Sequence, residues 1–166
     1  MQVPDKYSIE KKVILKGRYS ERENVEKTKA ALGMIENIDE NVGKIIKTLK
    51  EIDKYEDTII IFLSDNGPNG NRWNNELKER KGSTNEGGVR VPFFIQWPNE
   101  IKPGIKIKQV TSALDVFPTL TDLIDSPTGI NFDGKSFKKY IENPDLLDNE
   151  RKVFSFRIGY NYLRDK

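Results

Sequence analysis

A long amphipathic segment leads into a short apolar run, and this succession constrains the fold more than any other feature. From about residue 23 to residue 52, apolar residues recur at steps of three and four, which predicts a helix with one apolar face. The run from Thr58 to Leu63 is β-branched and apolar at consecutive positions, which is typical of a strand buried on both faces. This order predicts an α/β domain with a mostly parallel sheet and flanking helices.

The later segments continue the alternation of strands and helices. Residues 89–97 predict a second strand, in which Pro92 argues against a central, fully hydrogen-bonded position. A helix is expected to begin near Asp115, a suitable N-cap, with Pro118 in its first turn. Residues 136–141 predict a short amphipathic helix, and residues 153–156 the start of a final strand.

Composition removes several kinds of chemistry. The chain has no Cys and no His, which excludes a thiol nucleophile, an imidazole base and the usual zinc sites. Its net charge, 28 − 26 = +2, gives no reason to expect a nucleic acid or an anionic membrane as partner. No apolar run is long enough to cross a bilayer, and the first residues lack the apolar core of a secretory signal.

The strongest local signal is the segment Ser64-Asp65-Asn66-Gly67 directly after the first strand. In open α/β sheets, ligands bind beyond the carboxyl ends of the strands, where Asp65 and Asn66 are expected to lie. Their hard oxygen atoms suit Ca²⁺ or Mg²⁺, although two ligands are too few for a complete site. The alternative is that Asp-Asn-Gly serves as turn chemistry alone.

A second signal surrounds Lys81, which Gly82 follows in a polar stretch before the second strand. Its ammonium group could neutralise an anion such as sulfate or phosphate, and Arg72 is a further candidate for substrate binding. Gly87 and Gly88 would let the backbone pass close to another element. The alternative for both cations is a solvated, basic loop.

Five segments follow one another over about residues 25–138: AALGMIENIDENVGKIIKTLKE, DTIIIFLSDNGPNGNR, ERKGSTNEGGVRVPFFIQWP, TSALDVFPTLTDLI and DGKSF. Taken in this order, they resemble the sulfatase family of the alkaline-phosphatase-like superfamily. The resemblance implies hydrolysis of sulfuric esters, with a Ca²⁺ or Mg²⁺ ion and a formylglycine nucleophile made within a C/S-x-P-S-R motif. It also implies that Asp65 and Asn66 ligate the metal and that Lys81 contacts the sulfate.

The resemblance further implies how the chain is divided. Residues 23–145 match the C-terminal portion of a sulfatase catalytic domain, preceded by a lead-in at residues 1–22. Residues 146–166 would begin a truncated C-terminal subdomain. The implied substrate is a sulfated small molecule or glycan, and the parent protein would be periplasmic or secreted, although this chain shows no export signal.

The departures from the family pattern are large. The sequence contains no C/S-x-P-S-R motif, no early acidic metal-binding pair before residue 25 and no active-site His. We therefore expect a catalytic-domain fragment that is inactive alone, with the missing N-terminal half as a candidate partner. Two alternatives stay open: a phosphoesterase or phosphonate hydrolase of the same superfamily, and a non-catalytic module that depends on a partner. The sequence does not distinguish Ca²⁺ from Mg²⁺ or identify the sulfate ester.

Overall fold

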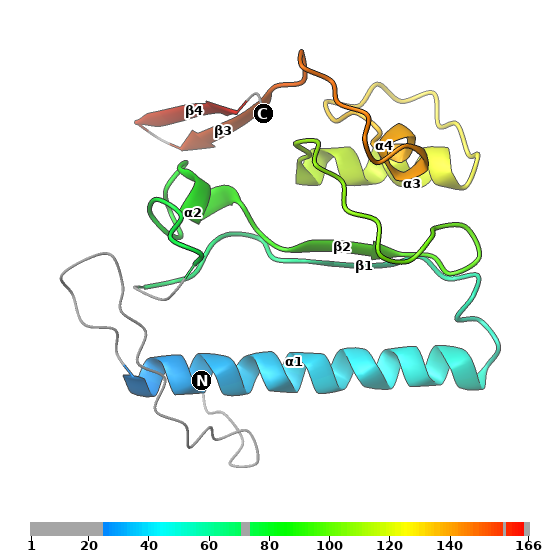
Figure 1. The fold of residues 1–166 in the computed structure, drawn as a ribbon, viewed down its shortest axis with the longest axis horizontal. Helices are drawn as coiled ribbons and strands as arrows, with labels where there is room; N and C mark the ends of the chain where they lie inside the picture. The colour runs from blue at the N-terminus through cyan, green and yellow to red at the C-terminus, as the bar shows by residue number, and fades with distance from the viewer. Residues whose placement is uncertain (1–24, 71–73, 158, 165–166) are drawn as a thin grey trace. The chain divides into compact units, whose positions relative to one another are not determined.

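The computed structural model describes residues 25–70, 74–157 and 159–164 of the chain. The chain divides into two compact units, one ending at Glu100 and the other beginning at Ile101, each of which is described by itself (Figure 1). The domain boundaries predicted at residues 22 and 145 stay predictions, and the lead-in at residues 1–22 lies outside the described residues. Among the described residues, no helix combines the length and the apolar character that a bilayer span requires.

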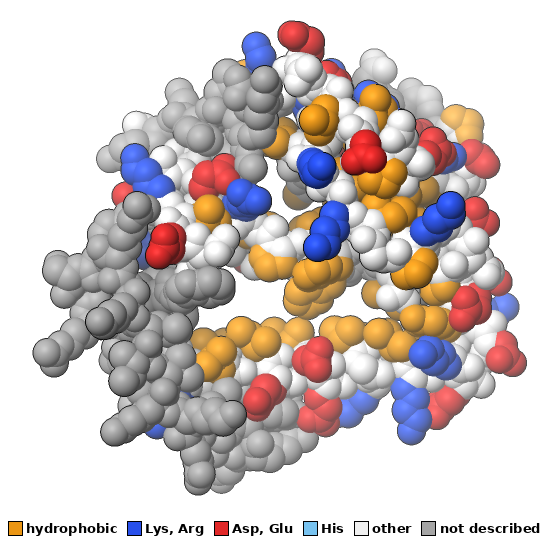
Figure 2. Space-filling model, viewed as in Figure 1, with side chains coloured by type: hydrophobic (Ala, Val, Ile, Leu, Met, Phe, Trp, Pro, Cys, Tyr) orange, Lys and Arg blue, Asp and Glu red, His pale blue; other side chains and the backbone are white. Residues whose placement is uncertain are grey.

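The first unit begins with the predicted long helix, α1 (Val25–Glu51). Its charged face carries two pairs at the i,i+4 spacing, Lys44 with Glu40 at 2.9 Å and Lys47 with Glu51 at 3.7 Å. Exposed pairs of this kind contribute only about 0.3–0.5 kcal/mol each. On the apolar face, Ile35, Ile38 and Ile45 are also exposed among the described residues. Apolar side chains follow one side of α1 (Figure 2). The helix prediction is confirmed.

The predicted strands are present as β1 (Ile60–Leu63) and β2 (Phe93–Gln96). They pair antiparallel, with Ile60 opposite Gln96 and Leu63 opposite Phe93. The α/β class is confirmed, but the prediction of a mostly parallel sheet is wrong for the described residues, where both two-stranded sheets are antiparallel. An apolar run indicates burial and carries no information on direction; here the connection returns the chain at the carboxyl end of β1.

Burial of β1 on both faces is also wrong within this chain. Phe62 and Leu63 are each 41% exposed, and Phe94 on the paired strand is 64% exposed. The β2 strand begins one residue after Pro92, so the proline lies outside the ladder, as the sequence predicted.

The second unit contains short elements. A 3-10 turn η2 (Ala113–Asp115) leads into α3 (Val116–Leu123), followed by α4 (Lys138–Glu142) and the hairpin of β3 (Val153–Arg157) with β4 (Tyr160–Arg164). The predicted helix start near Asp115, the short helix near residue 138 and the strand at residue 153 are confirmed. The buried apolar residues of this unit are Val110, Phe137, Tyr140 and Ile141.

A buried ionic network organises this second unit around Asp115, which is 1% exposed. Its carboxylate accepts hydrogen bonds from the backbone N–H of Ser112 at 2.8 Å and of Lys135 at 2.7 Å. Nη2 of Arg151 lies 2.7 Å from both carboxylate oxygens. The hydroxyl of Thr119 donates to the Asp115 carbonyl at 2.6 Å. Asp115 therefore joins the turn that begins α3 to two other segments, at Lys135 and at Arg151.

Candidate functional site

The turn after β1 is fixed by its backbone. The N–H of Ser64 donates to the carbonyl of Pro92 at 3.3 Å, and its hydroxyl donates to the carbonyl of Asn66 at 3.1 Å. Three residues on, the N–H of Gly67 donates to the carbonyl of Gly88 at 2.8 Å. The turn is thus held at both ends by the segment that leads into β2.

The loop that carries Lys81 is tied to the same turn. The N–H of Lys81 donates to the carbonyl of Pro68 at 3.1 Å, which places its backbone beside the residue two positions after Asn66. The N–H of Gly87 donates to the carbonyl of Lys78 at 2.7 Å and closes the loop. The two segments that the sequence singled out separately therefore come together at the carboxyl end of β1.

Glycines make this approach possible. A Cβ atom added to Gly67 would lie 1.8 Å from the carbonyl oxygen of Gly87. A Cβ atom added to Gly87 would lie 2.1 Å from the carbonyl oxygen of Glu79. At Gly88 it would lie 2.1 Å from the carbonyl oxygen of Ser83. Real Cβ atoms do not come so close to backbone oxygens, so the close passage predicted for the two consecutive glycines is confirmed. They lie in a short helix, α2 (Glu86–Val89), which the sequence did not predict.

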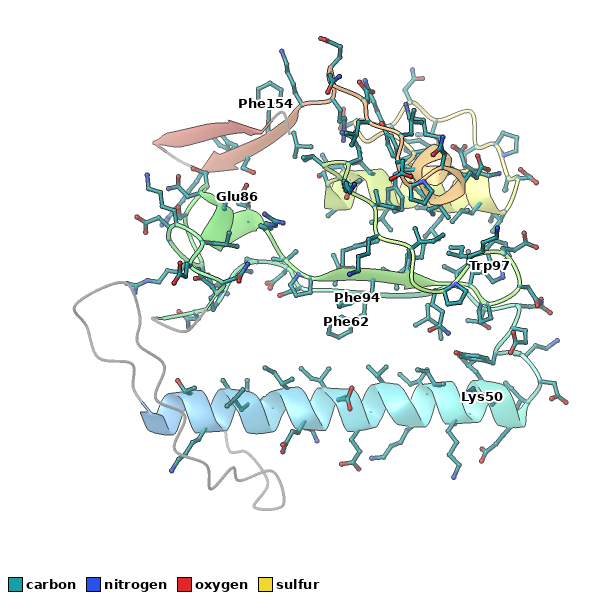
Figure 3. All side chains as sticks on the ribbon, in the orientation of Figure 1. Lys50, Phe62, Glu86, Phe94, Trp97 and Phe154 are labelled. Carbon is teal, nitrogen blue, oxygen red and sulfur yellow. The ribbon has the colours of Figure 1, made fainter. Side chains whose placement is uncertain are left out.

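Side chains also brace the loop. The Nδ2 group of Asn74 donates to the carbonyls of Leu77 at 3.1 Å and Glu79 at 2.9 Å. Arg90 forms an ion pair with Glu86 at 3.5 Å; Glu86 is labelled in Figure 3. The sequence analysis did not single out Asn74. Its only signal was that an Asn side chain in a polar loop can hydrogen-bond nearby backbone groups.

The candidate ligands themselves are not used by the fold. Asp65 and Lys81 are exposed and Asn66 is half-buried. Within the described residues, none of the three side chains forms a hydrogen bond or an ion pair with another. Arg72, the other predicted substrate-binding residue, lies outside the described residues.

The donor set fits part of a site for a hard cation. Asp65 offers a carboxylate and Asn66 an amide oxygen, on neighbouring residues of one turn, and neither oxygen is committed to a partner elsewhere in the described chain. Among the described residues, no cluster of three or more Asp, Glu, His or Cys side chains is placed to hold a metal ion. A complete site would need further ligands.

Comparison with known proteins identifies the family. The sulfatase family model matches residues 4–126. Mouse steryl-sulfatase is 37% identical over 138 residues, which cover 76% of this chain and 22% of that protein. The solved structure of a protein in complex with its substrate, D-glucosamine-2-N,6-O-disulfate, superposes on this chain with a TM-score of 0.69 and 20% sequence identity. The superposition covers 85% of this chain and 30% of that protein chain.

A second solved structure shares the fold. The phosphonate monoester hydrolase of Silicibacter pomeroyi gives a TM-score of 0.63 at 25% identity, over 77% of this chain and 24% of that one. The chain thus spans about a quarter of the length of these relatives, with the alkaline-phosphatase-like architecture that they have in common. Because the family model covers most of its residues, this chain belongs to the sulfatase family.

Proposed function

We propose that this chain supplies part of the active site of a sulfuric ester hydrolase. Asp65 and Asn66 provide two oxygen ligands for a divalent cation, Ca²⁺ or Mg²⁺, and Lys81 binds the sulfate group. The observation that carries the proposal is the 3.1 Å hydrogen bond from the Lys81 N–H to the Pro68 carbonyl. It brings the backbone of Lys81 beside the turn that carries the two oxygen donors, and this proximity supports the proposal.

Each residue has a distinct role in this proposal. Asp65 contributes negative charge to the cation, and the amide oxygen of Asn66 adds a ligand without adding charge. The bound cation would offset the charge of the sulfate oxygens. Lys81 offers three N–H donors and a compact positive charge to the same anion, which stabilises charge that develops during ester cleavage.

We propose that the nucleophile comes from outside the printed sequence. The 166 residues contain no Cys and no C/S-x-P-S-R motif, from which the family makes formylglycine. We propose that the chain alone turns over no sulfate ester, because loss of a covalent nucleophile costs about 10⁶ in rate even when the binding groups remain.

The relatives narrow the substrate class. Steryl-sulfatases act on sulfated sterols by name, and the structural neighbour binds a disulfated glucosamine. Both compounds carry sulfate groups on a small molecule or a sugar. We therefore propose that the substrate of this site is a sulfated small molecule or glycan. Hydrolysis of a phosphonate or phosphate ester is the second candidate, and the structural similarity to a phosphonate monoester hydrolase favours it.

The test compares 4-nitrophenyl sulfate with 4-nitrophenyl phosphate. The enzyme is the polypeptide encoded by the longest reading frame that contains this chain, and the 166-residue chain is assayed beside it. We expect the sulfate ester to be preferred and Lys81→Ala to lower kcat about 10²–10³-fold. Lys78→Ala, in the same loop, is the matched control and should retain full activity. Equal activity of the two variants, or preference for the phosphate ester, would refute the proposal.

A further inference from the structure

One side-chain amide holds the segment that leads into Lys81. Nδ2 of Asn74 donates to the carbonyl of Leu77 at 3.1 Å and to that of Glu79 at 2.9 Å. Asn74 is half-buried, whereas Lys81 is exposed. Because an amide NH₂ group carries two N–H donors, these two bonds use both of them. The Asn74 donors are therefore committed to the backbone and not to a ligand.

The carbonyls of the same segment that Asn74 does not reach accept from backbone donors. The carbonyl of Lys78 accepts from the N–H of Gly87 at 2.7 Å, and that of Arg80 accepts from the N–H of Ser83 at 3.0 Å. Every carbonyl of residues 77–80 is thus hydrogen-bonded, and the side-chain amide supplies two of the four bonds. The peptide units directly before Lys81 are fixed one after another.

The segment needs these bonds because its backbone is left-handed at three residues. The angle φ is 60° at Asn75, 59° at Glu76 and 68° at Glu79. In this region the Cβ atom of an L-residue crowds the carbonyl oxygen, so a residue such as Glu stays there only where its surroundings impose it. The two bonds from Asn74, to residues 77 and 79, enclose all three left-handed residues.

The amide of Asn74 is packed from its other side as well. A Cβ atom added to Gly87 would lie 2.7 Å from Nδ2 of Asn74 and 2.1 Å from the carbonyl oxygen of Glu79. The backbone of α2 is therefore in close contact with the hydrogen bond between Asn74 and Glu79. This contact leaves the amide little room for another arrangement.

We propose that Asn74 is a positioning residue for Lys81. Its amide holds residues 75–80 in their left-handed path, and this path determines where the Lys81 ammonium group meets the sulfate. The side chain of Lys is long and flexible, so the backbone from which it projects is the part that the fold can hold in place. Asn74 has this role only through Lys81, so the inference rests on the proposed function.

The test is a double-mutant cycle, measured with 4-nitrophenyl sulfate on the polypeptide encoded by the longest reading frame that contains this chain. We expect Asn74→Ala to lower kcat about 10–10²-fold, because misplacement of a binding group by about 1 Å can cost 10² in rate. In the Lys81→Ala background, the same replacement should change kcat less than about twofold, since no ammonium group is left to position. Lys78→Ala, at an exposed side chain of the same loop, is the matched control and should retain full activity.

A second variant and a second measurement test the hydrogen bonds directly. Asn74→Asp keeps the shape of the side chain and replaces its two donors with acceptors, so it should lose as much kcat as Asn74→Ala. In both variants, hydrogen–deuterium exchange followed by mass spectrometry should be faster in the peptide over residues 77–83 and unchanged in α1. Full activity of Asn74→Asp, or unchanged exchange in that peptide, would overturn the proposal.

The cycle separates a positioning role from a merely structural one, and from a failure of the proposed function. If Asn74→Ala lowers kcat by the same factor with and without the Lys81 ammonium group, or does not lower it at all, the positioning role is refuted while the proposed function stands. Full activity of Lys81→Ala would instead refute the proposed function, and this inference with it.

Discussion

Replacement of Asp115 by Asn removes one charge from the most buried ionic group in the described residues and leaves its shape almost unchanged. The carboxylate is 1% exposed and accepts from two backbone N–H groups, of Ser112 at 2.8 Å and Lys135 at 2.7 Å. Both oxygens also lie 2.7 Å from Nη2 of Arg151, whose side chain is 13% exposed. Every direction from which this carboxylate can accept is therefore occupied by a donor.

The cost of Asp115→Asn follows from this geometry. The amide keeps one acceptor oxygen but points its NH₂ group at donors, and the Arg151 guanidinium loses its counterion while it stays buried. Breaking a buried pair in this way destabilises proteins by about 3–5 kcal/mol. Because total stabilities are about 5–15 kcal/mol, the second unit should lose a large part of its free energy of unfolding.

Urea unfolding followed by far-ultraviolet circular dichroism measures this loss. Asp133→Asn is the matched control, because Asp133 is exposed, and it should change the free energy of unfolding by less than about 0.5 kcal/mol. The double variant Asp115→Asn with Arg151→Met should recover part of the loss, since no uncompensated charge stays buried. A loss below about 1 kcal/mol for Asp115→Asn alone would refute the reasoning.

Three further predictions concern the first unit. Gly67→Ala, whose Cβ would lie 1.8 Å from the Gly87 carbonyl oxygen, should destabilise by at least about 2 kcal/mol in urea unfolding, and faster amide exchange at Gly67 should accompany it. Gly43→Ala, with no atom within 4 Å of the added Cβ in α1, should instead stabilise by about 0.5–1 kcal/mol, and a loss would mean that the helix face is covered. Calorimetric titration should show Ca²⁺ binding no tighter than about 1 mM, abolished by Asp65→Asn; micromolar affinity would contradict a partial site.

The helix and the position of the first strand could be predicted because their patterns are local. Apolar spacing along α1 reports a helical face directly, and the turn formers after Leu63 mark where β1 ends. Whether β1 and β2 pair parallel or antiparallel depends on the path of the connection formed by residues 64–92. A local sequence pattern does not determine that path. The short helix α2 was missed because four residues with two glycines have almost no helical propensity.

The candidate site was predictable in residue type and not in arrangement. Asp65 and Asn66 could be expected at the end of a strand, but the hydrogen bond from Lys81 to Pro68 joins two loops through backbone atoms alone. The side-chain types of Lys81 and Pro68 do not indicate that their backbone groups form a hydrogen bond. Arg151 was not singled out for the same reason, since its partner Asp115 lies 36 residues away.

Backbone hydrogen bonds and the Asn74 side chain hold the loop around Lys81, and the side chains of Asp65 and Lys81 take no part in them. Gly67 and Lys81 meet the opposite segments through backbone groups, so neither the Asp65 side chain nor the Lys81 side chain is needed to hold the turn. The opposite holds at Asp115, where every acceptor direction is used internally. We therefore expect Asp65→Asn and Lys81→Ala to leave the free energy of unfolding within about 0.5 kcal/mol, in contrast to Asp115→Asn. Destabilisation of the first unit by either variant, measured in the same urea titration, would assign these side chains to the scaffold and remove them from the binding site.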